Sequence, residues 1–228
     1  MDKVLSVIMP AYNEAGHIHG ILEKVCHVVL PFDFSMQLVV VNDGSKDNTT
    51  AVVKSFIEHH PDRDIILMEH TCNQGKGMAI RTGLTAVKGS YVVIQDGDEE
   101  LDPNDFVKML RTMCNQDLQV LYGSRFLGKY RKTYAYRSFY FGTRLLSVLT
   151  NILYSQHITD EPTCYKMFRS DLIKSIRLEC HGFEFCPEIT AKVGRRGLKI
   201  KEIPIHYYPR TMEEGKKIRY RDGLIAIW

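Results

Sequence analysis

The sequence predicts an α/β fold with a mostly parallel central sheet and helices on both faces. Three observations predict it. Strand-like and helix-like segments alternate over the first 122 residues. The segment Tyr91 to Ile94 is apolar throughout and flanked by glycines, as expected of a central strand. Polar motifs follow the strands, and open α/β sheets bind ligands at the carboxyl ends of their strands.

The elements follow in order along the chain. We expect strands at residues 4–9, 38–42, 65–69, 91–95 and 119–122, and helices near residues 14–29, 47–60, 76–88 and 104–115. Such alternation produces βαβ units with right-handed crossovers. A further helical pattern runs from residue 137 to residue 154. Its broad apolar stripe fits either a helix that packs on the core or a helix that lies in a lipid interface.

Composition bounds the class of protein. The chain has 228 residues, 44% of them hydrophobic and 25% charged, which fits one soluble globular domain. The net charge of +3 gives no support to nucleic-acid binding, although Lys and Arg outnumber acidic residues between positions 195 and 221. The six cysteines form no Cys-x-x-Cys pair, which indicates a reduced, cytosolic chain. No apolar run approaches the roughly 20 residues of a membrane span, so we expect membrane contact only from the surface.

Two carboxylates follow the apolar segment at residues 91–94 directly. After Gln95 come Asp96, Gly97 and Asp98, so both aspartates emerge at the carboxyl end of the predicted strand. Two hard oxygen ligands there suit Mg²⁺ or Mn²⁺, which uses one or two carboxylates together with substrate phosphates. Asp-Gly is also a common turn dipeptide, so the alternative is that both acids cap the following loop and helix.

Three other predicted strands end in groups that suit a nucleotide. Pro10 closes the first strand, followed by Tyr12 for stacking on a base and Glu14 for accepting a hydrogen bond from a ribose hydroxyl. Asp43 closes the second strand and could accept from a base N–H, and Lys76 in the glycine-rich turn after the third could neutralise phosphate. Helix caps and turns explain each motif alone, but they do not readily explain four strand ends in succession.

Together the motifs resemble those of the inverting family 2 glycosyltransferases with a GT-A fold, particularly the polyprenyl-phosphate (dolichyl-phosphate) mannose or glucose synthases. The resemblance spans nearly the whole chain in the family's order. It rests on Pro10-Ala11-Tyr12-Asn13-Glu14, Asn42-Asp43-Gly44-Ser45-x-Asp47, Asn73-x-Gly75-x-Gly77, Asp96-Gly97-Asp98, Gly123-Ser124-Arg125, Thr159-Asp160-Glu161-Pro162-Thr163-Cys164-Tyr165-Lys166, and Glu202-x-Pro204-Ile205 followed by Arg210 and Glu214-Gly215-Lys216-Lys217.

This resemblance implies roles for particular residues. Those expected to bind the nucleotide sugar are Pro10, Tyr12, Glu14, Asp43, Lys76, Gln95, Asp96, Gly97 and Asp98. Those expected to hold Mg²⁺ or Mn²⁺ are Asp96, Asp98 and Glu100, the last at a position where the family usually has Gln. Those expected to act in catalysis are Asp96, Asp98, Arg125, Asp160, Arg210 and Lys216. We expect Arg210 and Lys216 to lie on a basic C-terminal loop that closes over the diphosphate.

The resemblance also implies an organisation and partners. Residues 1–228 would form one GT-A domain, with a nucleotide-sugar-binding half at 1–122 and an acceptor half at 123–228. The implied partners are a nucleotide sugar (GDP-mannose or UDP-glucose), a polyprenyl phosphate and the membrane surface, with room for a partner protein that anchors the enzyme. The implied location is peripheral, at the cytoplasmic face of the membrane.

The acceptor distinguishes the main hypothesis from its alternatives. A phosphate monoester has a second pKa of about 6, so it attacks without a protein base, and Arg131 and Arg137 could hold it. A saccharide hydroxyl, the alternative acceptor, needs a general base, for which Asp160 and Glu188 are the candidates. Two further hypotheses are a nucleotide-sugar-binding module without turnover and a nucleotidyltransferase, but the latter's glycine-rich, basic entry loop is not evident.

Overall fold

The computed structural model describes residues 3–127 and 137–209, except for the side chains of residues 137–139. The strands in this part of the chain form one seven-stranded sheet in the order β3-β2-β1-β4-β6-β5-β7. β6 pairs antiparallel with both neighbours and the other pairings are parallel, which confirms the predicted mostly parallel sheet. The strands are β1 (Val4–Ala11), β2 (Ser35–Asn42), β3 (Asp64–Glu69), β4 (Tyr91–Ile94), β5 (Val120–Ser124), β6 (Lys166–Arg169) and β7 (Lys201–Pro204).

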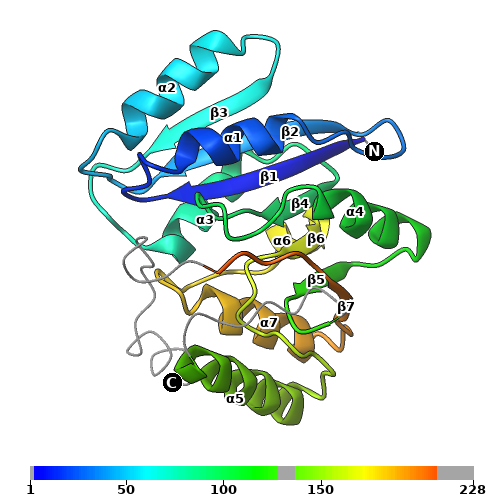
Figure 1. The fold of residues 1–228 in the computed structure, drawn as a ribbon. Helices are drawn as coiled ribbons and strands as arrows, with labels where there is room; N and C mark the ends of the chain where they lie inside the picture. Colours follow the sequence, from blue (N-terminus) through cyan, green and yellow to red (C-terminus); the bar gives the residue numbers. More distant parts are fainter. Residues whose placement is uncertain (1–2, 128–136, 210–228) are drawn as a thin grey trace.

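The helices connect the strands and cover the sheet. In Figure 1, α1 and α2 lie at the end of the molecule near β2 and β3, and α5 and α7 lie at the other end, near β5 and β7. The helices are α1 (Ile18–Cys26), α2 (Thr49–His59), α3 (Lys76–Ala86), α4 (Asp105–Asn115), α5 (Arg137–Tyr154), α6 (Ser170–Ser175) and α7 (Phe185–Arg195). None of the described helices is long and apolar enough to cross a membrane.

The core lies along the central strands. Residues 5–9 of β1 are all buried, so both faces of this strand are covered, as a central strand of a parallel sheet requires. α3 packs on one face, where Gly83 brings the helix backbone close to the side chains of Ile8 and Val41. A side chain at residue 83 would begin with a Cβ only 2.6 Å from the Ile8 side chain. Close helix packing therefore requires glycine at this position.

Two features differ from the sequence-based expectation. α1 begins at Ile18 rather than near residue 14, because residues 12–17 form a loop in which Asn13 adopts a positive φ of 51°. The short strands β6 and β7 had no recognisable pattern, because each has only four residues. β6 inserts between β4 and β5, so segments far apart in the sequence share the middle of the sheet.

Candidate active site

The sheet order predicts a crevice next to β1. The chain runs outward from β1 to β2 and β3 and then returns to β4 on the other side of β1. Such a reversal opens a binding crevice outside the carboxyl ends of the two central strands. Ala11 ends β1 and Ile94 ends β4, so the loops that follow them border this crevice. The motifs with Tyr12 and with Asp96 therefore meet at one edge of the sheet.

The loop after β1 is held by the loop after β2. The backbone N–H groups of Asn13, Glu14 and Ala15 donate to the side chains of Ser45 (2.9 Å), Thr49 (2.9 Å) and Asp47 (3.1 Å). Burial raises the pKa of Asp47, but hydrogen bonds from Thr49 and Ala15 outweigh it and leave the pKa below its ordinary value. Ser45, Asp47 and Thr49 therefore hold the backbone that carries Tyr12 and Glu14. This contact explains why these three polar residues follow β2.

Asp43 has a different environment from the one expected of a base-binding group. Its buried carboxylate accepts four hydrogen bonds from the protein. One oxygen accepts from the His70 ring (2.7 Å) and the Gln74 amide (2.9 Å), and the other from the Asn73 side chain (2.9 Å) and the Gly75 amide (2.8 Å). Four donors occupy the acceptor sites of a carboxylate. Asp43 therefore anchors the loop at 73–75, and its expected contact with a base stays a prediction.

The glycine-rich turn before α3 packs against a distant segment of the chain. The amides of Gly77 and Met78 donate to the carbonyls of Gly182 (3.1 Å) and His181 (3.0 Å). Gly75 has a φ of 97°, and a Cβ there would lie 2.4 Å from the carbonyl oxygen of His181. The glycines thus permit close approach by the 181–182 segment of the chain itself.

Lys76 lies against the first carboxylate of the Asp-Gly-Asp motif. Its Nζ donates to Asp96 at 2.5 Å and lies 3.6 Å from the Cys164 sulfur and 5.9 Å from the centre of the Phe183 ring. Burial lowers the pKa of Lys76, but the Asp96 carboxylate outweighs this and holds the pKa above its ordinary value. Lys76 therefore stays charged and fixes Asp96 at the edge of the crevice.

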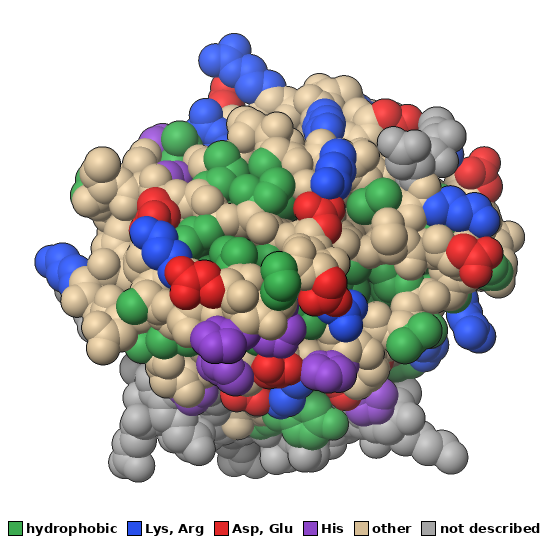
Figure 2. All heavy atoms as spheres, turned by 90° about the horizontal axis from the view of Figure 1, so that it is seen from above, with side chains coloured by type: hydrophobic (Ala, Val, Ile, Leu, Met, Phe, Trp, Pro, Cys, Tyr) green, Lys and Arg blue, Asp and Glu red, His purple; other side chains and the backbone are tan. Residues whose placement is uncertain are grey.

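The three carboxylates expected to hold a metal do not form a preformed three-carboxylate site. Asp98 accepts the backbone N–H of Glu100 at 3.0 Å. Within residues 3–127 and 137–209, no group of three or more His, Cys, Asp or Glu side chains is arranged to hold a metal ion. This includes the histidines that gather on the face shown in Figure 2. Asp96 and Asp98 fit a cation whose remaining ligands come from substrate phosphates, because Mg²⁺ commonly binds in this way.

The side chain of Gln95 is buried and makes hydrogen bonds to other residues of the protein. Its side-chain oxygen accepts from the hydroxyl of Tyr165 at 2.6 Å, and its side-chain nitrogen donates to the carbonyl of Asp96 at 3.0 Å. Its backbone N–H donates to the carbonyl of Ile8 in β1. Gln95 therefore orients the backbone of the carboxylate motif, and Tyr165 on the segment before β6 supports it.

Arg125 and the fully buried Asp160 form an ion pair at the carboxyl end of β5. The Asp160 carboxylate accepts three N–H groups of Arg125, from the backbone (2.9 Å), Nε (2.7 Å) and Nη2 (2.7 Å). Glu202 of β7 holds the same loop by accepting from the amides of Thr159 (2.7 Å) and Asp160 (3.0 Å). The guanidinium of Arg125 also lies 5.2 Å from the centre of the Tyr207 ring. The pair is thus fixed from two strands.

The segment after β7 is fastened to the loop that carries Asp98. The amide of Tyr208 donates to the carbonyl of Glu100 at 2.8 Å. His206 donates twice to the carboxylate of Asp105 at the start of α4, from its amide (2.6 Å) and its ring Nδ1 (2.9 Å). These contacts bring the end of the described chain to the crevice. Arg131, Arg210 and Lys216 lie outside the described residues, as does the side chain of Arg137.

Sequence reasoning did not single out Glu161 or Lys166 as individual residues. Both side chains are fully buried next to Tyr122. Lys166 donates to the carbonyl of Glu161 (2.5 Å) and its Nζ lies 3.9 Å from the centre of the Tyr122 ring. Glu161 accepts from Thr190 (3.0 Å), while its second oxygen has no hydrogen-bond partner. Burial raises the pKa of Glu161 above its ordinary value, although Lys166 opposes this. The signal in the sequence that could have indicated this buried pair is the charged pattern Asp-Glu-x-x-x-x-Lys at the start of a short strand.

The fold is that of a class of enzymes, the glycosyltransferases with a GT-A fold. The structure is similar to that of the mannosyltransferase PcManGT from Pyrobaculum calidifontis solved with GDP-Man and Mn²⁺ (TM-score 0.62, 20% identity, 88% of this chain and 54% of that one). It is also similar to glucosyl-3-phosphoglycerate synthase from Mycobacterium tuberculosis solved with Mn²⁺, UDP and phosphoglyceric acid (TM-score 0.68, 18% identity, 98% and 76%). Both likenesses confirm the predicted fold.

The family follows from the sequence match. The model of glycosyl transferase family 2 matches residues 6–177, and the chain belongs to this family. It is 31% identical over 217 residues to the dolichyl-phosphate beta-glucosyltransferase ALG5A of Trichomonas vaginalis, covering 89% of this chain and 65% of that protein. It is 26% identical over 234 residues to the UDP-N-acetylglucosamine--dolichyl-phosphate N-acetylglucosaminyltransferase of Methanococcus voltae, covering 95% and 91%. The chain thus spans about two thirds of the first relative and most of the second.

Proposed function

We propose that the chain transfers a hexose from a nucleotide sugar to a polyprenyl phosphate, with inversion at the anomeric carbon and with a divalent cation. The relatives named for transfer to dolichyl phosphate support this acceptor. Their names also support glucose or N-acetylglucosamine as the sugar, so UDP-glucose is the first donor to test. GDP-mannose is the second, because the similar Pyrobaculum calidifontis mannosyltransferase was solved with it.

The observation that carries the proposal is that both carboxylates considered as a general base are engaged by the protein. Asp160 accepts three N–H groups of Arg125. Glu188 accepts the amides of Glu179 (2.7 Å) and Cys180 (3.0 Å) and pairs with Lys192 (2.6 Å). Burial raises the pKa of Glu188, but these hydrogen bonds outweigh it and lower the pKa. A phosphate acceptor needs no such base, whereas a hydroxyl does.

The residues at the crevice divide the work of the reaction. The loop with Pro10, Tyr12 and Glu14 would hold the nucleoside. Asp96 and Asp98 would hold Mg²⁺ or Mn²⁺, which would offset the negative charge that develops on the departing diphosphate. Lys76 would keep Asp96 in place, and its positive charge would add to the same effect.

The second half of the chain would serve the acceptor. Arg125, held by Asp160, would contribute a fixed positive charge close to the acceptor phosphate. Arg210 and Lys216 would add charge on the diphosphate side. Residues 1–122 and 123–228 would thus act as a donor half and an acceptor half of one domain. We place the enzyme peripherally at the cytoplasmic face of the membrane, where a partner protein could anchor it.

A transfer assay tests the proposal directly. The chain is incubated with radiolabelled UDP-glucose or GDP-mannose, Mg²⁺ or Mn²⁺, and a polyprenyl phosphate. We expect an organic-extractable, labelled lipid phosphate with one donor, and none when the cation is chelated. Transfer to a soluble saccharide together with inert lipid phosphates would instead favour a hydroxyl acceptor. Donor binding that ignores the cation, with no product or hydrolysis, would favour a binding module.

A further inference from the structure

α5 is oriented with its polar side toward the protein. Thr143, Ser147 and Thr150 are buried, each less than 9% exposed. Ser147 accepts the amide of Glu161 at 2.9 Å and donates to the carbonyl of Thr143 at 2.9 Å. Asn151 exchanges hydrogen bonds with the backbone of Ile158 at 2.8 and 2.9 Å. The polar residues of this helix therefore fasten it to the segment before β6.

The apolar side of α5 faces outward. Phe141, Leu145, Val148 and Ile152 are 67%, 52%, 47% and 73% exposed. Their spacing of four, three and four residues places them on one stripe of the helix. A surface helix of a protein surrounded by water shows the reverse arrangement, with its apolar stripe buried and its polar face exposed. A contiguous exposed apolar stripe of this kind indicates a surface that binds something other than water.

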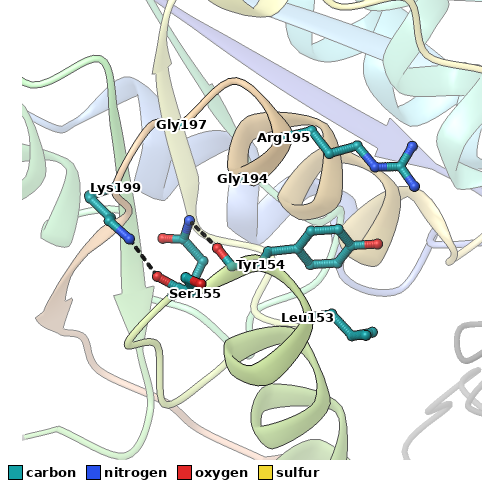
Figure 3. A pocket seen from close by; sticks show the side chains of 8 residues that line it. Leu153, Tyr154, Ser155, Gly194, Arg195, Gly197 and Lys199 are labelled. Atoms are coloured by element: carbon teal, nitrogen blue, oxygen red, sulfur yellow. Dashed lines mark hydrogen bonds between the residues drawn. The ribbon is translucent and has the colours of Figure 1, made fainter.

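Positive charge borders one end of this stripe. A cavity of about 550 Å³ lies between the end of α5 and the end of α7, and Arg195 and Lys199 are among the residues that line it. Figure 3 shows Tyr154 and Arg195 extending in the same direction, and the guanidinium lies 6.0 Å from the centre of the Tyr154 ring. Lys199 donates to the carbonyl of Ser155 at 2.6 Å. The sequence of α5 itself contains no Asp or Glu.

We propose that the stripe of Phe141, Leu145, Val148 and Ile152 docks on a lipid bilayer, with Arg195 and Lys199 contacting anionic lipid head groups. Eighteen residues extend about 27 Å, enough for a helix lying in the plane of the interface. Charge complementarity favours a bilayer over a second copy of the chain, because the α5 of a second copy has no acidic side chain to offer to the cations. The inference does not depend on the transferase proposal.

Vesicle flotation tests the apolar part of the surface. The chain is floated with phosphatidylcholine vesicles containing phosphatidylserine, without donor or acceptor. We expect the wild type to float and Leu145→Gln/Ile152→Gln to lose about tenfold in vesicle-bound fraction. Both side chains are exposed, so the melting temperature should not fall. Val29→Gln is the matched control, because Val29 is 86% exposed in the connection between α1 and β2. It should bind vesicles like the wild type.

The charged part has its own test. Arg195→Gln/Lys199→Gln should weaken binding to vesicles with phosphatidylserine several-fold and leave binding to pure phosphatidylcholine unchanged. Added salt should reduce wild-type binding to the anionic vesicles and affect this variant less. Equal loss on both vesicle types, or no loss on either, would contradict the assignment of these cations to head groups.

Other results would overturn the docking surface as a whole. They are absence of wild-type flotation, equal flotation of the Leu145→Gln/Ile152→Gln variant, and a dimer seen by light scattering that this variant disrupts while flotation is unchanged. Transfer is assayed separately with a short, water-soluble polyprenyl phosphate. Flotation without transfer would contradict only the transferase proposal, and transfer without flotation would contradict only the docking surface.

Discussion

We propose two roles for the carboxylates at the polar edge of the sheet. Asp43, Asp47 and Asp160 accept backbone and side-chain N–H groups and hold neighbouring loops in place. Asp96 and Asp98 lie in the loop after β4, at the switch point of the sheet. A carboxylate bound by several donors is a positioning group, whereas one that meets a substrate diphosphate through a cation acts on the reaction itself.

The proposed metal-binding role of Asp96 and Asp98 gives a prediction for a single residue. We expect Asp98→Asn to lower kcat by about 10²- to 10³-fold, because a neutral amide is a poor ligand for Mg²⁺. Thermal-shift measurements with nucleoside diphosphate should show that Mn²⁺ no longer adds to the stabilisation. The control is Glu99→Gln, the adjacent acid, which pairs with Lys24 of α1. Metal-enhanced binding that survived in Asp98→Asn would remove this residue from the metal site.

Buried Glu161 gives a prediction about pH. Its pKa in the folded protein is raised above the ordinary value of 4.5 by burial, so the folded state holds its proton more tightly than the unfolded state. This contribution to stability is complete below about pH 4.5 and is lost as pH rises through the folded pKa. The melting temperature of Glu161→Gln should therefore gain on that of the wild type as pH rises through this window.

The comparison needs a control for net charge. Glu58→Gln removes the same charge from an exposed position on α2 and should not reproduce the pH-dependent gain. Melting curves of the three proteins between about pH 4 and pH 8 provide the measurement. A difference between Glu161→Gln and wild type that stayed constant, or that shrank as pH rose, would contradict the raised pKa of Glu161.

At the scale of elements, the loops at the strand ends are held by glycines as well as carboxylates. Gly44 has a φ of 67°, and a Cβ there would lie 2.4 Å from the carbonyl carbon of Cys72. Gly75 also has a positive φ, and a Cβ there would lie too close to the backbone of His181. These positions bring the loops after β2 and β3 into contact, so that Asp43 reaches the amides at 74 and 75.

Gly44→Ala should destabilise the protein by about 1–3 kcal/mol, because it combines a strained backbone with a steric clash. The matched control is Gly142→Ala in α5, where a Cβ would meet nothing within 4 Å and alanine favours the helix. We expect the control to be neutral or to stabilise by up to about 1 kcal/mol. Denaturant unfolding measures both variants, and equal stability of the two would contradict the close approach at Gly44.

The elements also show how far local pattern reaches. Long periodic segments such as α2 and α4 were predicted to within about two residues, because side-chain periodicity reflects which face is buried. Residues 14–17 were wrongly placed in a helix. The amides of Glu14 and Ala15 are bound by the side chains of Thr49 and Asp47, more than 30 residues away, and no local pattern reveals such a contact.

At the scale of the whole molecule, the two halves share one sheet. The proposed division at residue 122 falls within β5, and β6 from the second half separates β4 from β5 of the first. β7 then covers the outer side of β5. The proposed donor and acceptor halves therefore do not correspond to separate folding units.

This arrangement predicts the behaviour of a fragment. Residues 1–122 alone would leave the outer edge of β4 unpaired and β5 without either neighbour, and would expose apolar side chains that β6 covers. We expect this fragment to show no cooperative thermal transition by circular dichroism. We expect the full chain to unfold in a single cooperative transition. A fragment that melted cooperatively with native-like secondary structure would contradict the shared core.

The sequence by itself determined the class of the fold and the place of the proposed site, because hydrophobic periodicity and strand-end motifs are local and the carboxyl ends of parallel strands must meet at one edge. Only the tertiary structure decided what each polar group binds. Asp43 anchors a loop, Lys76 holds Asp96, and α5 turns its apolar side outward. The physical reason is that the role of a side chain depends on partners that are distant in the sequence. The Lys76–Asp96 contact joins residues 20 apart, and the Asp43–Gly75 contact joins residues 32 apart. The role of a helix likewise depends on which of its faces the rest of the fold covers.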